Sequence, residues 1–251
     1  MSRARNSLLA AAVADRGLAE NGAQGQPLLF EEAHLSDDIW LALASCEAVA
    51  RAGGRVGGAQ AAAVLREWVD GQRFRNVGAD RMKPLRDLAA GVPWMRSGSV
   101  DSAARATAVI RVAPLAFVVD ISNDADRASL DEVVRITSVD AGDDAAVMIA
   151  AVRRSIHGDL VPDARALADS SALDPSVAAA LRLAARHGDD LEGAMRAVES
   201  TDDERRVRVM TAFLLGAAGA AIPKQLLSAL PQRAELEAVI EPFAQLLTAV
   251  A

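Results

Sequence analysis

The sequence predicts an all-α protein, and three observations carry this prediction. Alanine-rich segments with apolar residues three and four positions apart recur along the whole chain, which is the period of a helix with one buried face. Alternating runs of β-branched residues, typical of half-buried strands, are nearly absent. Helix breakers such as Gly53-Gly54, Gly188 and Ile222-Pro223 separate the periodic segments. We therefore expect a compact multi-helix fold.

In the N-terminal half, each helix is predicted where the apolar period begins and ends. The start of the chain has a basic end and a short apolar run, but Asp15, Arg16 and Glu20 interrupt it too early for a signal peptide, so we interpret it as a first helix. The next helix begins at Ser36 and continues through an apolar run to Ala50. The helices predicted in this half cover residues 5–19, 36–52, 58–71, 83–90 and 101–110.

In the C-terminal half, the run APLAFVV at 113–119 is predicted to be helical, although it is apolar enough to form a strand. The segment 207–221 is apolar or small on every side after Val209, which is typical of a central helix. His157-Gly158 and His187-Gly188 resemble helix ends, because histidine suits a last turn and glycine the position after it. The helices predicted here cover residues 113–119, 126–138, 143–156, 162–170, 174–187, 189–199, 203–221 and 232–250.

Length and composition indicate one domain covering residues 1–251, because 51% of the residues are hydrophobic and no linker is visible. The net charge is −7, and the basic residues are scattered among acids, so we expect no nucleic-acid partner. No apolar stretch reaches the roughly 20 residues of a membrane span, so we expect no membrane partner either.

Cys46 is the only cysteine, which excludes an internal disulfide and points to a reducing, cytoplasmic location. It lies at helical spacing from Ile39, Leu43 and Ala50, so we expect a buried thiol.

Pairs of aspartates precede apolar helices at four places: Asp37-Asp38, Asp143-Asp144, Asp189-Asp190 and Asp202-Asp203. Carboxylates in a first helical turn interact favourably with the helix dipole, so each pair is either a helix-start feature or part of a divalent-metal site. His34 lies two residues before Ser36 and either approaches a site there or lies on the surface. The sequence contains no Ser/His/Asp grouping, zinc-ligand spacing or phosphate-binding glycine loop.

Four segments, in order, resemble the ADP-ribosylglycohydrolase family. The family's opening helix, ALLGLAxGDALG, is similar to SLLAAAVADRGL at residues 7–18, and its Thr-Asp-Asp-Thr motif is similar to residues 36–39. Its central motif, ending in RxAPL, is similar to AVIRVAPL at residues 108–115. Its late motif, AVNxGGDTDTxAAIAGAxxGA, runs without gaps onto residues 197–217.

The resemblance implies an all-α fold with a two-magnesium site between the early and late aspartate motifs. It implies Ser36, Asp37, Asp38 and Asp203 as metal ligands, because magnesium prefers oxygen donors. In an active enzyme, Asp37 and Asp38 would also be the catalytic residues that hold the metal and the attacking water.

Several positions depart from the family pattern. Arg205 stands where the late motif has its second aspartate, and Arg206 stands at its final threonine, although arginine cannot coordinate a cation. The glycine pair before the late motif is replaced by Thr201-Asp202, and the Asn-Gly element before Ala108 is replaced by Ala106-Thr107. The histidine motif that follows the central segment has no match at residues 137–140.

These departures suggest the hypothesis that the Arg205 guanidinium lies among Asp37, Asp38 and Asp203 and neutralises them in place of a metal. The protein would then be a non-catalytic member, without a metal cofactor, that binds ADP-ribose, an ADP-ribosylated protein or another protein. The alternative is a magnesium-dependent hydrolase that removes ADP-ribose from a modified protein or small molecule. A third possibility is an unrelated all-α protein.

Overall fold

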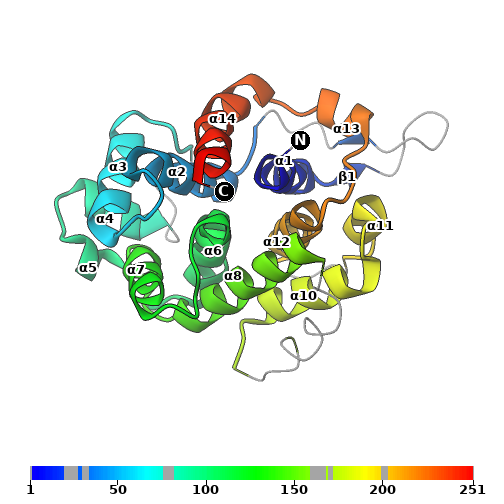
Figure 1. Ribbon diagram of the computed structural model, residues 1–251. Coiled ribbons are helices and arrows are strands. Elements are labelled where there is room, and N and C mark those ends of the chain that lie inside the picture. Colours follow the sequence, from blue (N-terminus) through cyan, green and yellow to red (C-terminus); the bar gives the residue numbers. More distant parts are fainter. Residues whose placement is uncertain are drawn as a thin grey trace. The chain divides into compact units, whose positions relative to one another are not determined.

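The computed structural model describes residues 2–19, 28–29, 34–75, 82–158, 168, 172–198 and 203–250. The predicted all-α class is confirmed, because helices dominate this part of the chain. Its single sheet is a two-residue antiparallel pair, β1 (Leu18–Ala19) with β2 (Leu28–Leu29). Figure 1 labels the elements.

The chain groups into two compact units, each built from two separate stretches of sequence. The first unit comprises Met1–Leu35 and Ala151–Glu237, and the second comprises Ser36–Ala150 and Ala238–Ala251. A boundary falls inside each of two helices, α8 (Gly142–His157) and α14 (Arg233–Val250). The single domain expected for residues 1–251 stays a prediction.

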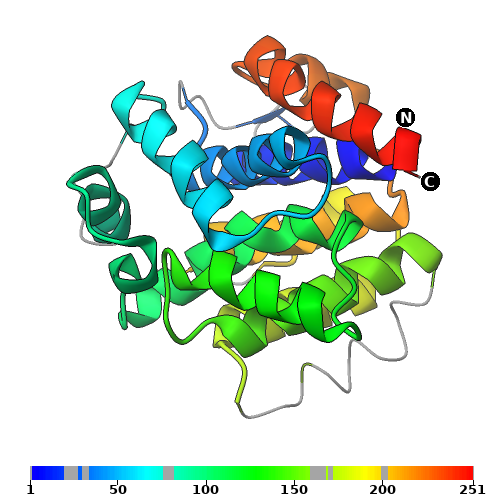
Figure 2. The ribbon, with the colours of Figure 1, turned by 60° about the vertical axis from the view of Figure 1, so that its left-hand side comes forward.

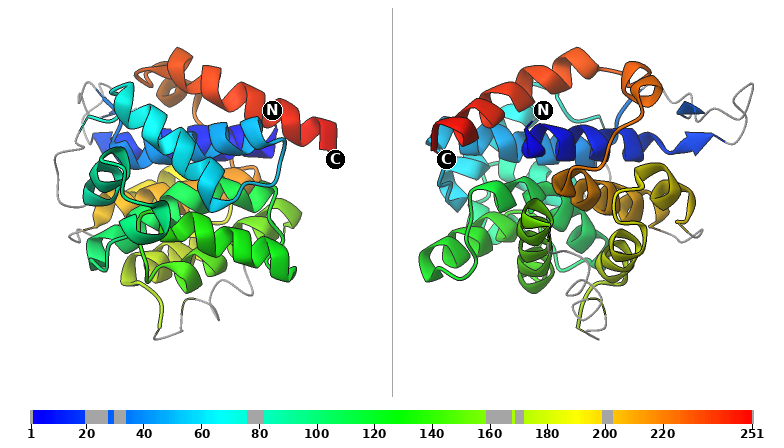
Figure 3. Two further views of the ribbon diagram at one scale, coloured as in Figure 1. Left: turned by 90° about the vertical axis from the view of Figure 1, so that its left-hand side faces the viewer. Right: turned by 45° about the vertical axis from the view of Figure 1, so that its right-hand side comes forward.

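The first unit is organised around α1 and α12, which run side by side (Figures 1 and 3). Gly216 permits this contact, since a Cβ there would lie 2.6 Å from the Ser7 Cα. Asn6 donates from Nδ2 to the carbonyls of Gly216 and Ala220 at 2.9 Å each, and Ser7 Oγ donates to Phe213 O at 2.6 Å. The described helices that lie wholly in this unit are α1 (Arg3–Arg16), α10 (Pro175–His187), α11 (Leu191–Arg196), α12 (Glu204–Ala218) and α13 (Lys224–Ser228).

In the second unit, α2 packs against α3 and α6, and α3 packs against α4 (Figures 1 and 2). Buried apolar and aromatic side chains lie between these helices. Helix α2 ends at Gly53, whose φ of +70° is a left-handed conformation that suits glycine. The helices that lie wholly in this unit are α2 (Asp37–Ala52), α3 (Gly58–Asp70), α4 (Lys83–Ala89), α5 (Trp94–Ser97), α6 (Ser102–Val112), η3 (Ala113–Phe117) and α7 (Asp124–Arg135).

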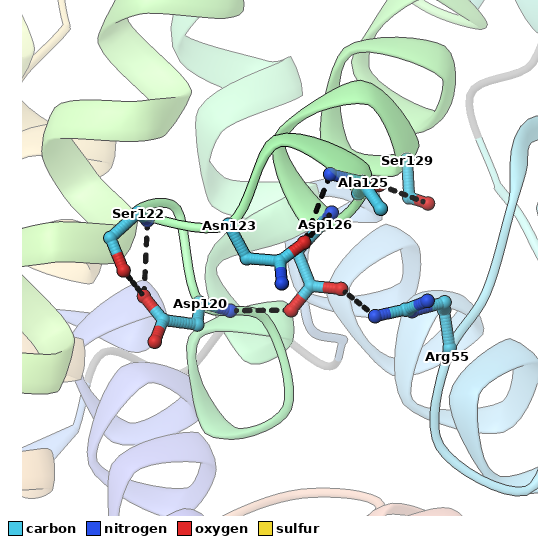
Figure 4. Close-up of polar contacts among 7 residues, drawn as sticks. All are labelled: Arg55, Asp120, Ser122, Asn123, Ala125, Asp126 and Ser129. Atoms are coloured by element: carbon cyan, nitrogen blue, oxygen red, sulfur yellow. Dashed lines mark hydrogen bonds and ion pairs between the residues drawn. The ribbon is translucent and has the colours of Figure 1, made fainter.

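Helix α7 begins at a cluster of polar side chains that accept hydrogen bonds from backbone N–H groups (Figure 4). Asn123 Oδ1 accepts from the backbone N–H groups of Ala125 and Asp126, which is an N-cap. Asp126 accepts from the Asp120 N–H at 3.0 Å and pairs with Arg55. The cluster therefore fixes the start of α7 and its connection to the loop after α2.

Most predicted helices are confirmed with ends that differ by a few residues. The run at 113–119 is a 3₁₀ helix over residues 113–117, so its helical interpretation is confirmed and the strand is excluded. The central position predicted for 207–221 is confirmed, because nearly all side chains of α12 after Val209 are buried. The helix predicted at 162–170 lies outside the described residues, apart from residue 168. No helix in the described part of the chain is long and apolar enough to cross a bilayer.

Candidate functional site

The early aspartates lie in the second unit, in the first turn of α2, with Ser36 at the N-cap. Both Asp37 and Asp38 are 4% exposed. Asp37 Oδ1 accepts from the backbone N–H of Arg75 at 2.8 Å, and Asp38 Oδ1 accepts from Thr107 Oγ1 at 3.0 Å. Each buried carboxylate is therefore already satisfied in part by a donor of its own unit.

The two donors come from separate elements that pack on α2. Thr107 is buried on α6, one turn into a helix that packs against α2. Arg75 lies in the segment that follows α3. In the same segment, the ring centroid of Phe74 lies 5.7 Å from that of Trp68. Trp68 in turn lies 6.3 Å from Trp40 of α2. The aromatic contacts thus hold the Arg75 backbone over the start of α2.

Replacing Thr107 by valine tests the contact with Asp38. Valine keeps the shape of threonine but removes the donor, so the free energy of unfolding should fall by about 2 kcal/mol in urea denaturation. Thr248→Val is the matched control, because Thr248 bonds only to its own helix at Ala244 O. An equal loss in both variants would contradict a specific role for the Asp38 contact.

The late motif lies in the first unit, at the start of α12. Asp203 is the N-cap residue of this helix, and its two oxygens are both engaged. Oδ2 accepts from Ser176 Oγ at 3.1 Å, and Oδ1 pairs with the guanidinium of Arg206. The Arg206 side chain is only 8% exposed and the Asp203 side chain is 33% exposed, so this ion pair is shielded from water mainly on the arginine side. Asp174 supports the arrangement by capping α10 at the Ser176 N–H, at 2.9 Å.

Arg205 points to the end of α1 within the same unit. Its Nε lies 3.8 Å from Oδ1 of Asp15, whose side chain is buried. One turn further along α12, Arg208 Nε donates to Ala14 O at 3.4 Å and its guanidinium pairs with Glu204. The arginines thus neutralise acids of the first unit. The hypothesis that Arg205 lies among Asp37, Asp38 and Asp203 stays a prediction for Asp37 and Asp38, which belong to the second unit.

Asp143, Asp144 and Asp190 lie at helix starts, where groups of the protein engage them. Asp144 is fully buried and pairs with Arg105 at 2.6 Å, while Asp143 is exposed and pairs with Arg127 at 3.0 Å. Asp190 caps α11 by accepting from the Gly193 N–H at 2.8 Å. Thr201 and Asp202 lie outside the described residues.

The histidines and the cysteine take the positions expected of them. His34 is exposed, and its carbonyl accepts from Arg16 Nη1 at 3.0 Å. His157 and His187 are the last residues of α8 and α10. Cys46 is buried, and burial raises the pKa of its thiol, so it stays protonated and unreactive.

The residues present fit a pair of divalent metals poorly. A hard cation needs carboxylate oxygens as ligands, and at Asp203 it would compete with the bonds that the two oxygens make to Ser176 and Arg206. Two arginines also follow Asp203 in the first turn of α12. In the described ranges, no group of three His, Cys, Asp or Glu side chains is arranged to hold a metal.

Sequence reasoning missed the donors that satisfy these acids. The sequence singles out Thr107 only because it replaces part of the family's Asn-Gly element. No sequence pattern predicts that Ser176 or Arg75 donates to these acids. Asp15 was noted only as an interruption of the first helix, although it falls within the segment that resembles the family's opening motif. The signal that could have predicted a partner for Asp15 is its position as a polar residue in an otherwise apolar helix.

Comparisons with known proteins agree with the fold. The family model for ADP-ribosylglycohydrolases matches residues 1–250. No curated protein sequence matches the chain. A solved structure described as an ADP-ribosylglycohydrolase-related protein complex is similar, with a TM-score of 0.69 and 21% sequence identity over 98% of this chain and 98% of that chain. The structural likeness concerns the fold.

Proposed function

The chain belongs to the ADP-ribosylglycohydrolase family, and from this premise we propose that it is a divergent, non-catalytic member that binds ADP-ribose or an ADP-ribosylated protein. The family acts on ADP-ribose-modified substrates, so the ligand class follows from family membership. The proposed loss of catalysis rests on the acids that the family motif implies as metal ligands, because donors of the protein already engage them. This function does not require a metal cofactor.

One observation carries the proposal: the acids expected to bind metal are engaged by donors of the protein itself. Asp203 accepts from Ser176 and pairs with Arg206, and Asp38 accepts from Thr107. A metal would have to replace a charge-assisted hydrogen bond from the buried Arg206, which is among the stronger polar contacts in proteins. These carboxylates therefore serve as acceptors that stabilise each unit.

The charge at the start of α12 supports the same proposal. Arg205 and Arg206 add two positive charges beside Asp203, and a divalent cation at this carboxylate would meet their repulsion.

Calorimetry and a turnover assay together test the proposal. We expect ADP-ribose to bind with the same affinity in excess EDTA and in millimolar magnesium, and we expect no release of ADP-ribose from a modified protein under either condition. The absence of binding under both conditions would contradict the proposal.

Magnesium-dependent release of ADP-ribose would instead support the alternative, a hydrolase. Two variants then identify its site. Asp38→Asn should abolish turnover in a hydrolase that uses the start of α2, whereas Asp143→Asn should not, because the Asp143 side chain is exposed and pairs only with Arg127. In the non-catalytic protein, both variants bind ADP-ribose as the parent does.

A further inference from the structure

Arg111 is a fully buried cation without an acidic partner. Its residue exposure is 0%, and its hydrogen-bond acceptors are the hydroxyl of Thr137 at 3.1 Å and the carbonyls of Val133 and Val134 at 2.5 and 3.4 Å. Within the described ranges no acidic side chain contacts the guanidinium, and Nη1 has no hydrogen-bond partner. The partial negative charge at the end of α7 is therefore its main compensation.

Ser138 provides a second buried polar atom without a hydrogen-bond partner in the described part of the chain. It is 1% exposed, and its Oγ makes no hydrogen bond in the described part of the chain. Its backbone N–H donates to Val134 O at 3.1 Å, the carbonyl that also accepts from Arg111 Nη2. Since Arg111 Nη2 and the backbone N–H of Ser138 share this acceptor, the two residues are neighbours.

Other polar groups near these two atoms have hydrogen-bond partners. Ser97 Oγ donates to Ile136 O at 2.8 Å, and the Ser99 N–H donates to Thr137 O at 3.1 Å. Gly98 approaches so closely that a Cβ there would lie 2.2 Å from Arg135 O. A tightly built helix end that leaves two buried donors unmatched indicates a missing acceptor.

We propose that a small monovalent anion of chloride size binds between Arg111 Nη1 and Ser138 Oγ in the second unit. Such an ion accepts a hydrogen bond from each group and supplies the counter-charge that the buried guanidinium lacks. A water molecule would accept the same hydrogen bonds but leave the charge uncompensated. Burial lowers the pKa of Arg111 to about 9, so the group is still protonated at neutral pH and needs a counter-ion. This site is independent of the ADP-ribose proposal.

Urea denaturation at constant ionic strength, with gluconate replaced stepwise by chloride, tests this site on the whole chain. The unfolding midpoint should rise with chloride concentration, because an ion that binds only the folded state stabilises it. In Ser138→Ala the apparent dissociation constant for chloride should increase about tenfold, since one hydrogen bond to the ion is lost. Crystals soaked in bromide should show an anomalous peak at Arg111.

Ser129→Ala is the matched control, because Ser129 is half-buried on α7 and its hydroxyl donates to Ala125 O of its own helix. It should keep the chloride dependence of the parent protein. Ser138→Ala carries the test in case Arg111→Met fails to fold. A midpoint that does not respond to chloride would overturn the proposal in favour of water, and an unchanged response in Ser138→Ala would overturn it in favour of an ion elsewhere.

Discussion

Replacing Trp68 by alanine should lower the free energy of unfolding by about 4 kcal/mol, the usual range for deleting a buried tryptophan. Trp68 is among the largest fully buried side chains. Its ring contacts Trp40 and Phe74, its Nε1 donates to Glu47 at 2.9 Å, and the Arg73 guanidinium lies 4.4 Å from the ring centroid. Alanine would leave a cavity where α2, α3 and the segment after α3 meet.

The same variant should loosen the Arg75 backbone that donates to Asp37, because Phe74 would lose the ring on which it packs. Urea denaturation measures the stability, and amide hydrogen exchange at Arg75 measures the local effect. Trp68→Phe should lose less, since it keeps most of the ring volume but not the bond to Glu47. Trp94→Ala is a control at a half-buried tryptophan of α5. A similar loss at Trp94 would contradict a special role for Trp68.

Replacing Gly216 by valine should cost about 3 kcal/mol, because the new side chain would overpack the contact between α1 and α12. Even a Cβ would lie 2.6 Å from Ser7 Cα and 3.0 Å from Asn6 O, which are backbone atoms that cannot rotate away. Separating the helices would also stretch the hydrogen bonds that Asn6 and Ser7 make to carbonyls of α12.

Ala218→Val is the matched control for this prediction. Ala218 lies two residues later on the same helix and is half-buried, so valine there brings a similar helix propensity without the clash. Urea denaturation of both variants should show a large loss for Gly216→Val and a loss below about 1 kcal/mol for the control. Equal losses would mean that the close approach of α1 and α12 contributes little.

The elements that the sequence failed to predict are the short ones. Helices α5 and α13 span four and five residues, and β1 and β2 span two residues each. Such segments are too short to show an apolar period, so their conformation depends on neighbouring elements. Cys46 in α2 shows the opposite case, since three apolar residues at helical spacing predicted its burial and the structure confirms it.

The sequence by itself determined the helical class, the family and the exchange of acid for base at Arg205, because periodicity and motifs are properties of neighbouring residues. Only the tertiary structure decided which donors meet each acid. Thr107 and Asp38 are 69 residues apart, and Ser176 and Asp203 are 27 apart. Hydrogen bonds of this kind depend on how helices pack against one another, and no local pattern specifies them. The packing therefore shows which donors of the protein meet Asp38 and Asp203, and their role as metal ligands, which the motif implies, stays a prediction.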